Sequence, residues 1–416
     1  MSRRWIAAAL GAVVGAAMPA PDADAQEKRR ITFLTWNIPV VADLIQGWIA
    51  EFQARHPDVE VEWLDKKGTE WPTFYQTQVA AGTPPDIIDV QGGLWLEYAA
   101  NGGLLDMTPY LEKEPEVRDR FNADYLANWV YEDGNYMLPF YISKTLLFYN
   151  KRMFEEAGLD GPPESFDEIL DYAAKVSGGE KTGFMTLNFD WLFWPLFAMN
   201  GVELLNEDMT EAAFNTPEAL EVLTRLAEAT RAGHVNNISW TGRWVEPNNA
   251  FATGDVGMHH AHSPAFFYIR GQGDWVSPET LGAGHMPGGY ATPNSHGLGI
   301  SSATEHPDVA WEFVKLITAE DSAHAFSDRL KVLTGNVASD ERIMEGLRGS
   351  DPLAFEVLQT QLEHTDRMVG TWRTAKDAAI KEAFWPEIQA ALLGQKSPEE
   401  ALATAEGKVN RVLRRR

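Results

Sequence analysis

The stretch from Gly134 to Leu170 constrains the fold more than any other part of this 416-residue chain. Apolar residues alternate with others over 136–142, and a run of β-branched, aliphatic and aromatic residues covers 145–149, so two strands follow each other closely. Helix signals come next, because Asn150 suits an N-cap and Ser165 opens an S-x-x-E capping box. A strand that leaves one compact unit and enters another in this way is a crossover between two lobes.

Strands and helices alternate before this crossover, which predicts the first lobe. Ile31–Trp36, Val59–Trp63 and Ile87–Val90 have the composition of short strands. Val40–Arg55 and Trp71–Ala81 have apolar residues at helical spacing. This order is typical of a parallel sheet with helices on both faces.

The chain after the crossover is mostly helical, with strand-like runs over Val256–His260 and His296–Ser301. Because no low-complexity linker separates the units, strands must join them and form a hinge, with Tyr141–Lys144 as its pivot. The predicted lobes are residues 26–142 plus about 295–340, and residues 143–294 plus about 341–416.

The first 25 residues have the pattern of an export signal. Arg3 and Arg4 supply a positive start, Ile6–Ala17 is a short apolar core, and an A-x-A site precedes cleavage after Ala25. The paired arginines leave both the Sec and the twin-arginine route open. The chain has no cysteine, which excludes disulfides, thiolate metal sites and a lipoprotein anchor. We therefore expect an exported periplasmic protein without a lipid anchor.

Composition restricts the partners. A formal net charge of −25 disfavours nucleic acid and anionic membrane surfaces, and mildly disfavours a strongly anionic ligand. The 15 Trp and 11 Tyr suit a carbohydrate, because an aromatic ring covers the apolar face of a sugar while polar groups bind its hydroxyls. Each such contact adds on the order of 1 kcal/mol. Micromolar affinity needs about 8 kcal/mol, so a few stacking residues and hydrogen bonds suffice.

Eight stretches in order make the chain resemble the family 1 extracellular solute-binding proteins of sugar-type ABC importers. They are ITFLTW, HPDVEVEW, AAGTPPDIIDV, GGLLDMTPYL, FNTPEALEVL, FATGDVGM, GLGISSATEHPDVAWEFVKLITAEDSAHAFS and LLGQKSPEEALATAEGKVN. The resemblance implies an α/β, maltose-binding-protein-like clamshell of the type II periplasmic-binding-protein class, each lobe a mainly parallel sheet flanked by helices. It further implies delivery of a ligand, usually a sugar or sugar derivative, to a membrane permease. We also expect a monomer with no cofactor, no metal and no catalytic activity.

Residues that follow predicted strands are the first candidates for binding, because ligands of open α/β sheets sit outside the carboxyl ends of the strands. Others flank the crossover or lie in aromatic-rich loops. The predicted ligand-binding residues are Trp36, Asn37, Trp71, Gln91, Gly92, Trp95, Tyr141, Asp190, Trp191, Trp194, Trp240, Trp244, His260, His262, Ser263, Trp372 and Arg373.

Packing competes with binding at many of these positions. Trp191 and Trp194 are three residues apart on a predicted helix and share one face, which suits a core as well as a ligand. Trp240 and Trp244 lie in a loop region that contains Gly, Asn and Pro, where packing is less required. Arg373 can bind vicinal hydroxyls or a carboxylate with both guanidinium arms.

The run His259-His260-x-His262 raises the question of a zinc site. On a strand, residues 259 and 260 point to opposite faces, and no cysteine or close carboxylate completes a ligand set. Contacts to sugar hydroxyls, or packing, are therefore favoured for these histidines.

Two alternatives stay open. The same fold can bind a polyol phosphate, a sugar acid, a peptide or an opine, and an arginine at position 243, 270 or 373 near the cleft would favour an anion. An exported glycoside hydrolase would need a carboxylate pair, which could be drawn from Asp190, Glu203 and Glu246. Nothing in the sequence places two of these at the required separation.

Overall fold

The structure is a computed structural model that describes residues 28–36, 38–67, 70–186, 189–237, 245–369, 372 and 374–415, with the backbone alone for 189–192. The strands are β1 (Arg29–Trp36), β2 (Val59–Lys66), β3 (Ile87–Gln91), β4 (Val130–Tyr131), β5 (Gly134–Asn135), β6 (Leu138–Tyr141), β7 (Thr145–Asn150), β8 (Thr182–Thr186), β9 (Val256–His262), β10 (Leu281–Gly284) and β11 (His296–Ile300).

Helices make up most of the remaining regular structure. They are α1 (Ala42–Arg55), α2 (Trp71–Ala81), α3 (Leu94–Ala100), α4 (Thr108–Lys113), α5 (Pro115–Arg118), α6 (Ala123–Ala127), α7 (Lys151–Ala157), α8 (Phe166–Val176), α9 (Phe189–Met199), α10 (Pro217–Arg231), α11 (Val245–Ala252), α12 (Ser263–Gln272), α13 (Pro307–Ile317), α14 (Glu320–Leu330), α15 (Val337–Ser350), α16 (Pro352–Leu362), α17 (Asp377–Leu392) and α18 (Pro398–Arg414). Short 3-10 turns are η1 (Pro39–Val41), η3 (Pro287–Gly289) and η4 (Thr365–Arg367).

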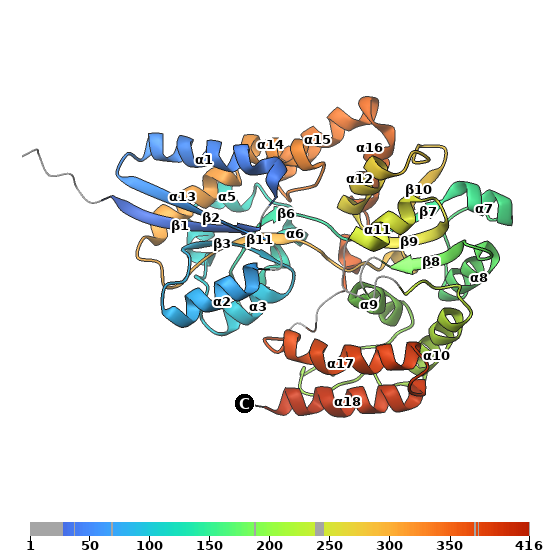
Figure 1. Cartoon of the computed structure of the whole chain (residues 1–416). Coiled ribbons are helices and arrows are strands. Elements are labelled where there is room, and N and C mark those ends of the chain that lie inside the picture. Colours follow the sequence, from blue (N-terminus) through green and yellow to red (C-terminus); the bar gives the residue numbers. More distant parts are fainter. Residues whose placement is uncertain are drawn as a thin grey trace, which may run out of the picture.

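The first lobe is built on a five-stranded sheet in the order β2-β1-β3-β11-β6 (Figure 1). Consecutive residues of β1 point to opposite faces, as expected of a strand. Phe33 packs into a core with α1, α13 and α14, and Leu34 packs into another with α2 and α3. Helices therefore cover both faces of this sheet.

The second lobe is built on a four-stranded sheet in the order β10-β7-β9-β8. Leu147 of β7 packs into a core with α8, α10, α17 and α18, whereas the next residue, Phe148, packs with α12, α15 and α16. Two sheets with flanking helices agree with the predicted α/β two-lobe arrangement. The exact lobe boundaries stay a prediction.

Strand direction agrees with the prediction that each sheet is mainly parallel, because a single strand in each, β11 in the first and β7 in the second, runs against the others. Parallel pairing occurs for β1 with β2 and β3, and for β8 with β9. Pairings that involve β11 or β10, and the pairing of β7 with β9, are antiparallel. The reason is topological: β7 and β11 enter their sheets from the crossover, so they begin at the edge where the neighbouring strands end.

Stretches 141–145, 292–296 and 331–336 run between the two lobes and bond to one another. Thr145 N donates to Thr292 O at 2.9 Å, and Ile142 N donates to Leu333 O at 2.8 Å. These bonds satisfy backbone groups that would otherwise be buried without partners. The predicted pivot at 141–144 thus lies among paired segments and not in a free linker.

Local signals around the crossover are confirmed. The Asn150 side chain accepts from the backbone N–H groups at the start of α7, which ends at Gly158 in the left-handed conformation with φ 71°. Ser165 Oγ accepts from Glu168 N at 3.1 Å, and the Glu168 carboxylate accepts from Glu164 N at 2.7 Å. The capping box therefore closes one residue earlier than its simplest form.

The predicted export signal and the cleavage point after Ala25 lie outside the described residues. Within the described ranges, no helix combines the length and apolar character needed to cross a bilayer.

Gly183 in β8 offers a test of how tightly α8 packs on the second sheet. A Cβ at Gly183 would lie 1.9 Å from the carbonyl oxygen of Ala173 in α8, so Gly183→Ala must push the helix away. We expect the free energy of unfolding, measured by urea denaturation, to fall by about 1–3 kcal/mol. Gly161→Ala is the matched control, because nothing lies within 4 Å of its added Cβ. Equal stability of the two variants would contradict this packing.

Candidate functional site

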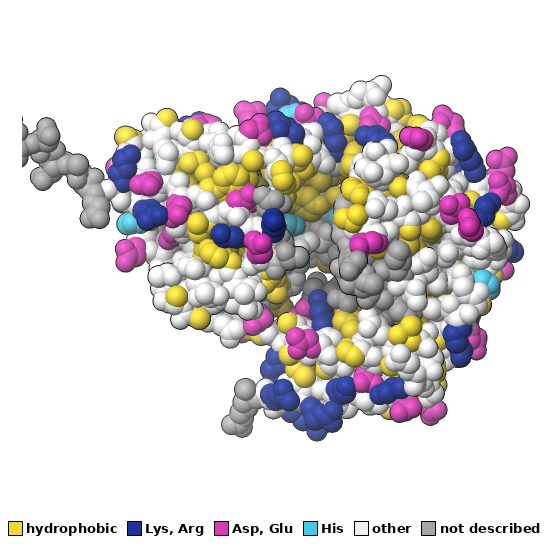
Figure 2. All heavy atoms as spheres, in the orientation of Figure 1, with side chains coloured by type: hydrophobic (Ala, Val, Ile, Leu, Met, Phe, Trp, Pro, Cys, Tyr) yellow, Lys and Arg dark blue, Asp and Glu magenta, His cyan; other side chains and the backbone are white. Residues whose placement is uncertain are grey.

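The carboxyl ends of strands from both sheets face the space between the lobes. The final residues of β1, β3, β6, β8 and β9 are Trp36, Gln91, Tyr141, Thr186 and His262. The crossover joins the two edges, because Thr145 at the start of β7 pairs with His262, and His296 at the start of β11 pairs with Gln91. Figure 2 shows the surface hollowed between the lobes. Ligands of open α/β sheets bind at such edges.

A chain of polar side chains connects these edges. Gln91 Nε2 donates to Asn294 Oδ1 at 2.8 Å, and Asn294 Nδ2 donates to His262 Nδ1 at 3.2 Å. Beside it, His296 Nδ1 lies 2.9 Å from Asp89 Oδ1. Asn294 belongs to the crossover stretch 292–296, so one amide on the hinge links a strand end of the first lobe to a strand end of the second.

An aromatic stack supports the edge of the first lobe. Trp36 stacks on Trp71, with ring centroids 5.3 Å apart and an interplanar angle of 9°, and Trp71 stacks on Tyr75 at 5.3 Å. His296 lies between Trp36 and Tyr141, with centroid distances of 5.9 Å and 4.8 Å. Trp71 is fully buried, whereas Trp36 and Tyr141 are partly exposed. Trp71 therefore backs the stack, and Trp36 is its exposed member.

Burial favours the neutral form of two histidines and one tyrosine in this region. It lowers the pKa of His260 and of His262 to about 3, and it raises the pKa of Tyr141 above its usual range. Burial also lowers the pKa of Lys144 to about 8, and its ammonium donates to the carbonyl oxygen of Glu363, away from the strand ends. The described side chains here are thus mainly neutral donors and acceptors, beside one carboxylate paired with an imidazole.

Three predicted binding residues pack in cores. Trp194 and Trp372 are 1% and 2% exposed, and their rings meet edge to face at 5.2 Å in the core that also holds Phe384. Trp95 is buried against Trp129 with ring centroids 5.7 Å apart. This geometry assigns packing roles to all three, and it lends no support to their predicted contact with a ligand.

Other predicted residues hold the crossover in place. Gly92, at φ 61°, donates from its N–H to Ser295 O at 2.9 Å, and glycine adopts this conformation without steric cost. Ser263 is buried, and its N–H donates to Lys144 O at 3.3 Å. Both therefore shape the hinge side of the edge through their backbone.

The histidines of β9 have separate partners. His259 Nε2 is 3.0 Å from Asn248 Oδ1, and His260 Nδ1 is 3.3 Å from Thr186 Oγ1. His262 contacts Asn294 as described above. Each histidine thus has its own partner, and among the described residues this run does not form a group of ligand atoms close enough to share an ion.

The remaining predicted residues fall outside what the structure describes. They are Asn37, Trp240, Trp244 and Arg373, together with the side chains of Asp190 and Trp191. Their predicted contacts with a ligand stay predictions.

Sequence reasoning missed Asp89, Asn294 and His296. A signal was present for Asp89, since a carboxylate within the apolar run Ile87–Val90 needs a partner when it is buried. That partner, His296, is 207 positions away in the sequence, so residue spacing could not reveal it.

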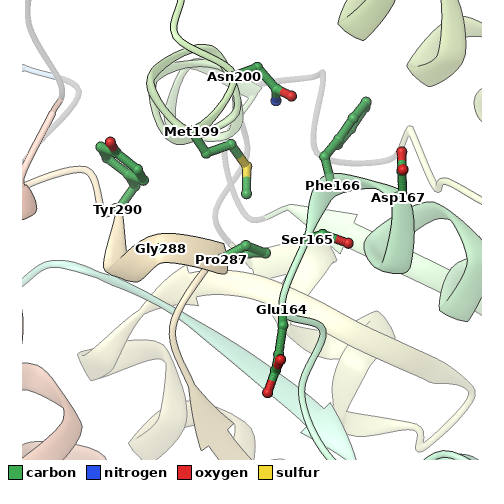
Figure 3. A pocket seen from close by; sticks show the side chains of 9 residues that line it. All are labelled: Glu164, Ser165, Phe166, Asp167, Met199, Asn200, Pro287, Gly288 and Tyr290. Atoms are coloured by element: carbon green, nitrogen blue, oxygen red, sulfur yellow. The ribbon is translucent and has the colours of Figure 1, made fainter.

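A separate pocket of about 350 Å³ lies between the start of α8, the end of α9 and the turn that begins at Pro287 (Figure 3). Phe166, Asn200 and Tyr290 are among its lining residues. All of its lining residues come from the second lobe. It therefore lacks the contribution from both lobes that characterises the strand-end site.

Comparisons with known proteins agree with this geometry. The family model described as bacterial extracellular solute-binding protein matches residues 38–324. A putative binding protein of Brucella abortus is 24% identical over 380 residues, covering 88% of each chain. The sn-glycerol-3-phosphate-binding periplasmic protein of Salmonella typhimurium is 28% identical over 301 residues, covering 67% of each. An ABC substrate-binding protein from Listeria monocytogenes in complex with cycloalternan has a similar fold, with a TM-score of 0.78, 23% identity, and coverage of 92% of this chain and 98% of that one.

Substitution of Trp372 distinguishes a packing role of this residue from a ligand-binding role. We expect Trp372→Ala to lower the free energy of unfolding by about 3–5 kcal/mol, since a large aromatic side chain leaves a cavity in a core. Trp372→Phe should cost much less, because it keeps a ring against Trp194 and Phe384. Urea denaturation followed by circular dichroism measures both. Native stability of Trp372→Ala, together with a loss of solute affinity, would restore the binding role.

Proposed function

Because the chain belongs to the bacterial extracellular solute-binding protein family, we propose that it is the periplasmic binding component of an ABC importer. It captures a mono- or oligosaccharide between its lobes, closes about the hinge, and docks in the closed form on the permease. The observation that carries this proposal is the convergence of strand ends from both sheets on one hinge-borne amide, that of Asn294.

The side chains at this edge suit a neutral polyhydroxylated solute. The indole N–H of Trp36 already donates to the backbone oxygen of Asp89 at 2.9 Å, so this residue offers a solute its ring face and not a hydrogen bond. Trp71 covers one face of that ring, and the part of the ring that stays exposed can lie against the apolar side of a sugar. The amides of Gln91 and Asn294 and the neutral imidazole of His262 supply donors and acceptors for hydroxyl groups.

Closure follows from contacts to both lobes. A solute that touches Trp36 on the first lobe and His262 on the second has more contacts when the lobes approach, so it shifts the population toward the closed form. The bends occur in the short stretches between the sheets, as in other hinge motions. We further propose export with cleavage after Ala25, transient docking on the permease subunits, and a monomeric state.

An anionic solute is the second candidate, and its support is the relative that is named for binding sn-glycerol 3-phosphate. Among the arginines considered for this role, Arg270 is engaged elsewhere, since it pairs with Asp351 at 2.6 Å and lies over the ring of Phe266. Arg243 and Arg373 lie outside the described residues. A sugar acid, a peptide or an opine would also belong to this alternative.

Catalysis is not part of the proposal, because the relatives named above are binding proteins. Turnover of an oligosaccharide by the purified protein would revive the glycoside hydrolase alternative.

A panel of solutes decides between the candidates. The protein is unfolded and refolded to remove co-purified solute, and thermal unfolding is measured with neutral saccharides, sugar acids and glycerol 3-phosphate. A bound solute at one hundred times its Kd adds about 2.7 kcal/mol of stability, so we expect a clear rise in Tm with a neutral saccharide. A rise with the phosphate or the acids alone would contradict the sugar proposal and favour the anionic alternative.

Trp36 tests the location of the site. We expect Trp36→Ala to lower the affinity for the solute identified by the panel on the order of tenfold, because an aromatic contact adds about 1 kcal/mol beyond area burial. Calorimetric titration measures this affinity. Trp275→Ala is the matched control, because Trp275 is also partly exposed and its N–H also donates to a backbone carbonyl, that of Ala252, at 3.0 Å. Similar losses in the two variants would rule out Trp36 as a ligand contact.

A further inference from the structure

Three side chains able to bind a metal meet at a point that the proposed function does not use. His285 directly follows β10, and Glu363 and His364 directly follow α16. One ligand atom from each lies within 4.8 Å of the others. His285 Nε2 is 3.1 Å from Glu363 Oε2, and the rings of His285 and His364 are 4.8 Å apart at 86°.

We propose that His285, Glu363 and His364 bind one divalent transition-metal ion of the zinc class. Two imidazoles and one carboxylate, with water in the fourth position, form a ligand set that suits zinc. Zinc ligands lie about 2.0–2.2 Å from the ion, so the side chains need only small rotations from their present separations to surround it. Imidazole donors favour zinc, copper or nickel over magnesium or calcium.

The backbone holds His364 toward the cluster. His364 adopts the left-handed conformation with φ 52°, which is uncommon for a residue other than glycine. Its ring lies against Gly289, where an added Cβ would be 2.6 Å from His364 Cγ. The lack of a side chain at position 289 thus leaves room for the ring beside His285.

The hydrogen bonds of His285 also point to a ligand. Its Nδ1 is buried and has no partner among the residues that the structure describes. A neutral imidazole that donates from Nε2 to Glu363 leaves Nδ1 as an unused lone pair. Rotation of the ring lets either nitrogen supply a lone pair to an ion, and the half-exposed Glu363 side chain leaves a path for the ion to enter.

A positive charge close to the cluster opposes cation binding. The Lys144 ammonium donates to the carbonyl oxygen of Glu363, and its positive charge weakens cation binding. The site also borders the hinge, since the next residue, Thr365, donates from its hydroxyl to Asp124 of the first lobe at 3.1 Å.

Metal titration tests the proposal on protein that is free of tags and stripped with chelator. Zinc is titrated by calorimetry, and cobalt(II) by its visible absorption, whose intensity reports tetrahedral coordination. We expect one ion per chain at micromolar zinc. His364→Ala and Glu363→Gln should each lower the affinity for zinc at least about tenfold, a loss typical of damaged metal sites.

Two further variants control for other causes. His234→Ala removes a partly exposed histidine elsewhere in the second lobe and should leave zinc affinity unchanged. Gly289→Ala keeps all three ligands but displaces the His364 ring. It should therefore lower the affinity for zinc while the circular dichroism spectrum stays native. Absence of one-to-one binding at micromolar zinc would overturn the proposal. Undiminished binding in both His285→Ala and His364→Ala would do the same.

Discussion

Backbone hydrogen bonds between residues 141–145 and residues 292–296 are the constraint on which the rest of the structure depends. Thr145 donates to Thr292, and Asn294 donates to Ser143, so two extended stretches that run between the lobes pair with each other. The bond from Ile142 to Leu333 ties in the third stretch. Buried backbone groups need such partners. The pairing leaves the lobes free to bend at a few dihedral angles but opposes sliding or twisting of one lobe past the other.

This pairing also brings together the strand ends at which we propose that a solute binds. Because β7 and β11 begin at the crossover, the neighbouring strands end there, and their last residues face each other across the gap. Asn294 lies on the hinge itself and holds Gln91 of one lobe and His262 of the other. In the proposed mechanism, a solute that replaces or extends these bonds is sensitive to the hinge angle, and this sensitivity would couple binding to closure.

The same crossover is linked to the proposed metal cluster through Lys144. Its backbone N–H donates to Gln361 Oε1 at 3.0 Å, and its ammonium caps the carboxyl end of α16 at Glu363. A cation at this end of a helix is favourable, because the helix dipole leaves partial negative charge on the last carbonyl groups. That interaction offsets part of the cost of burying a lysine, and it places the turn with Glu363 and His364 beside the hinge.

The sequence by itself determined the local elements and the crossover, because caps such as Asn150 and Ser165 and the two-residue alternation before Tyr141 act over a few neighbouring residues. It also placed Trp36 and Gln91 at strand ends. Only the tertiary structure decided that β11 and β7 run against the other strands of their sheets, that Trp194 and Trp372 are buried, and that Asp89 pairs with His296. These features depend on contacts between residues far apart in the chain. Local periodicity does not indicate which distant residue will pack into a core or pair with a buried charge.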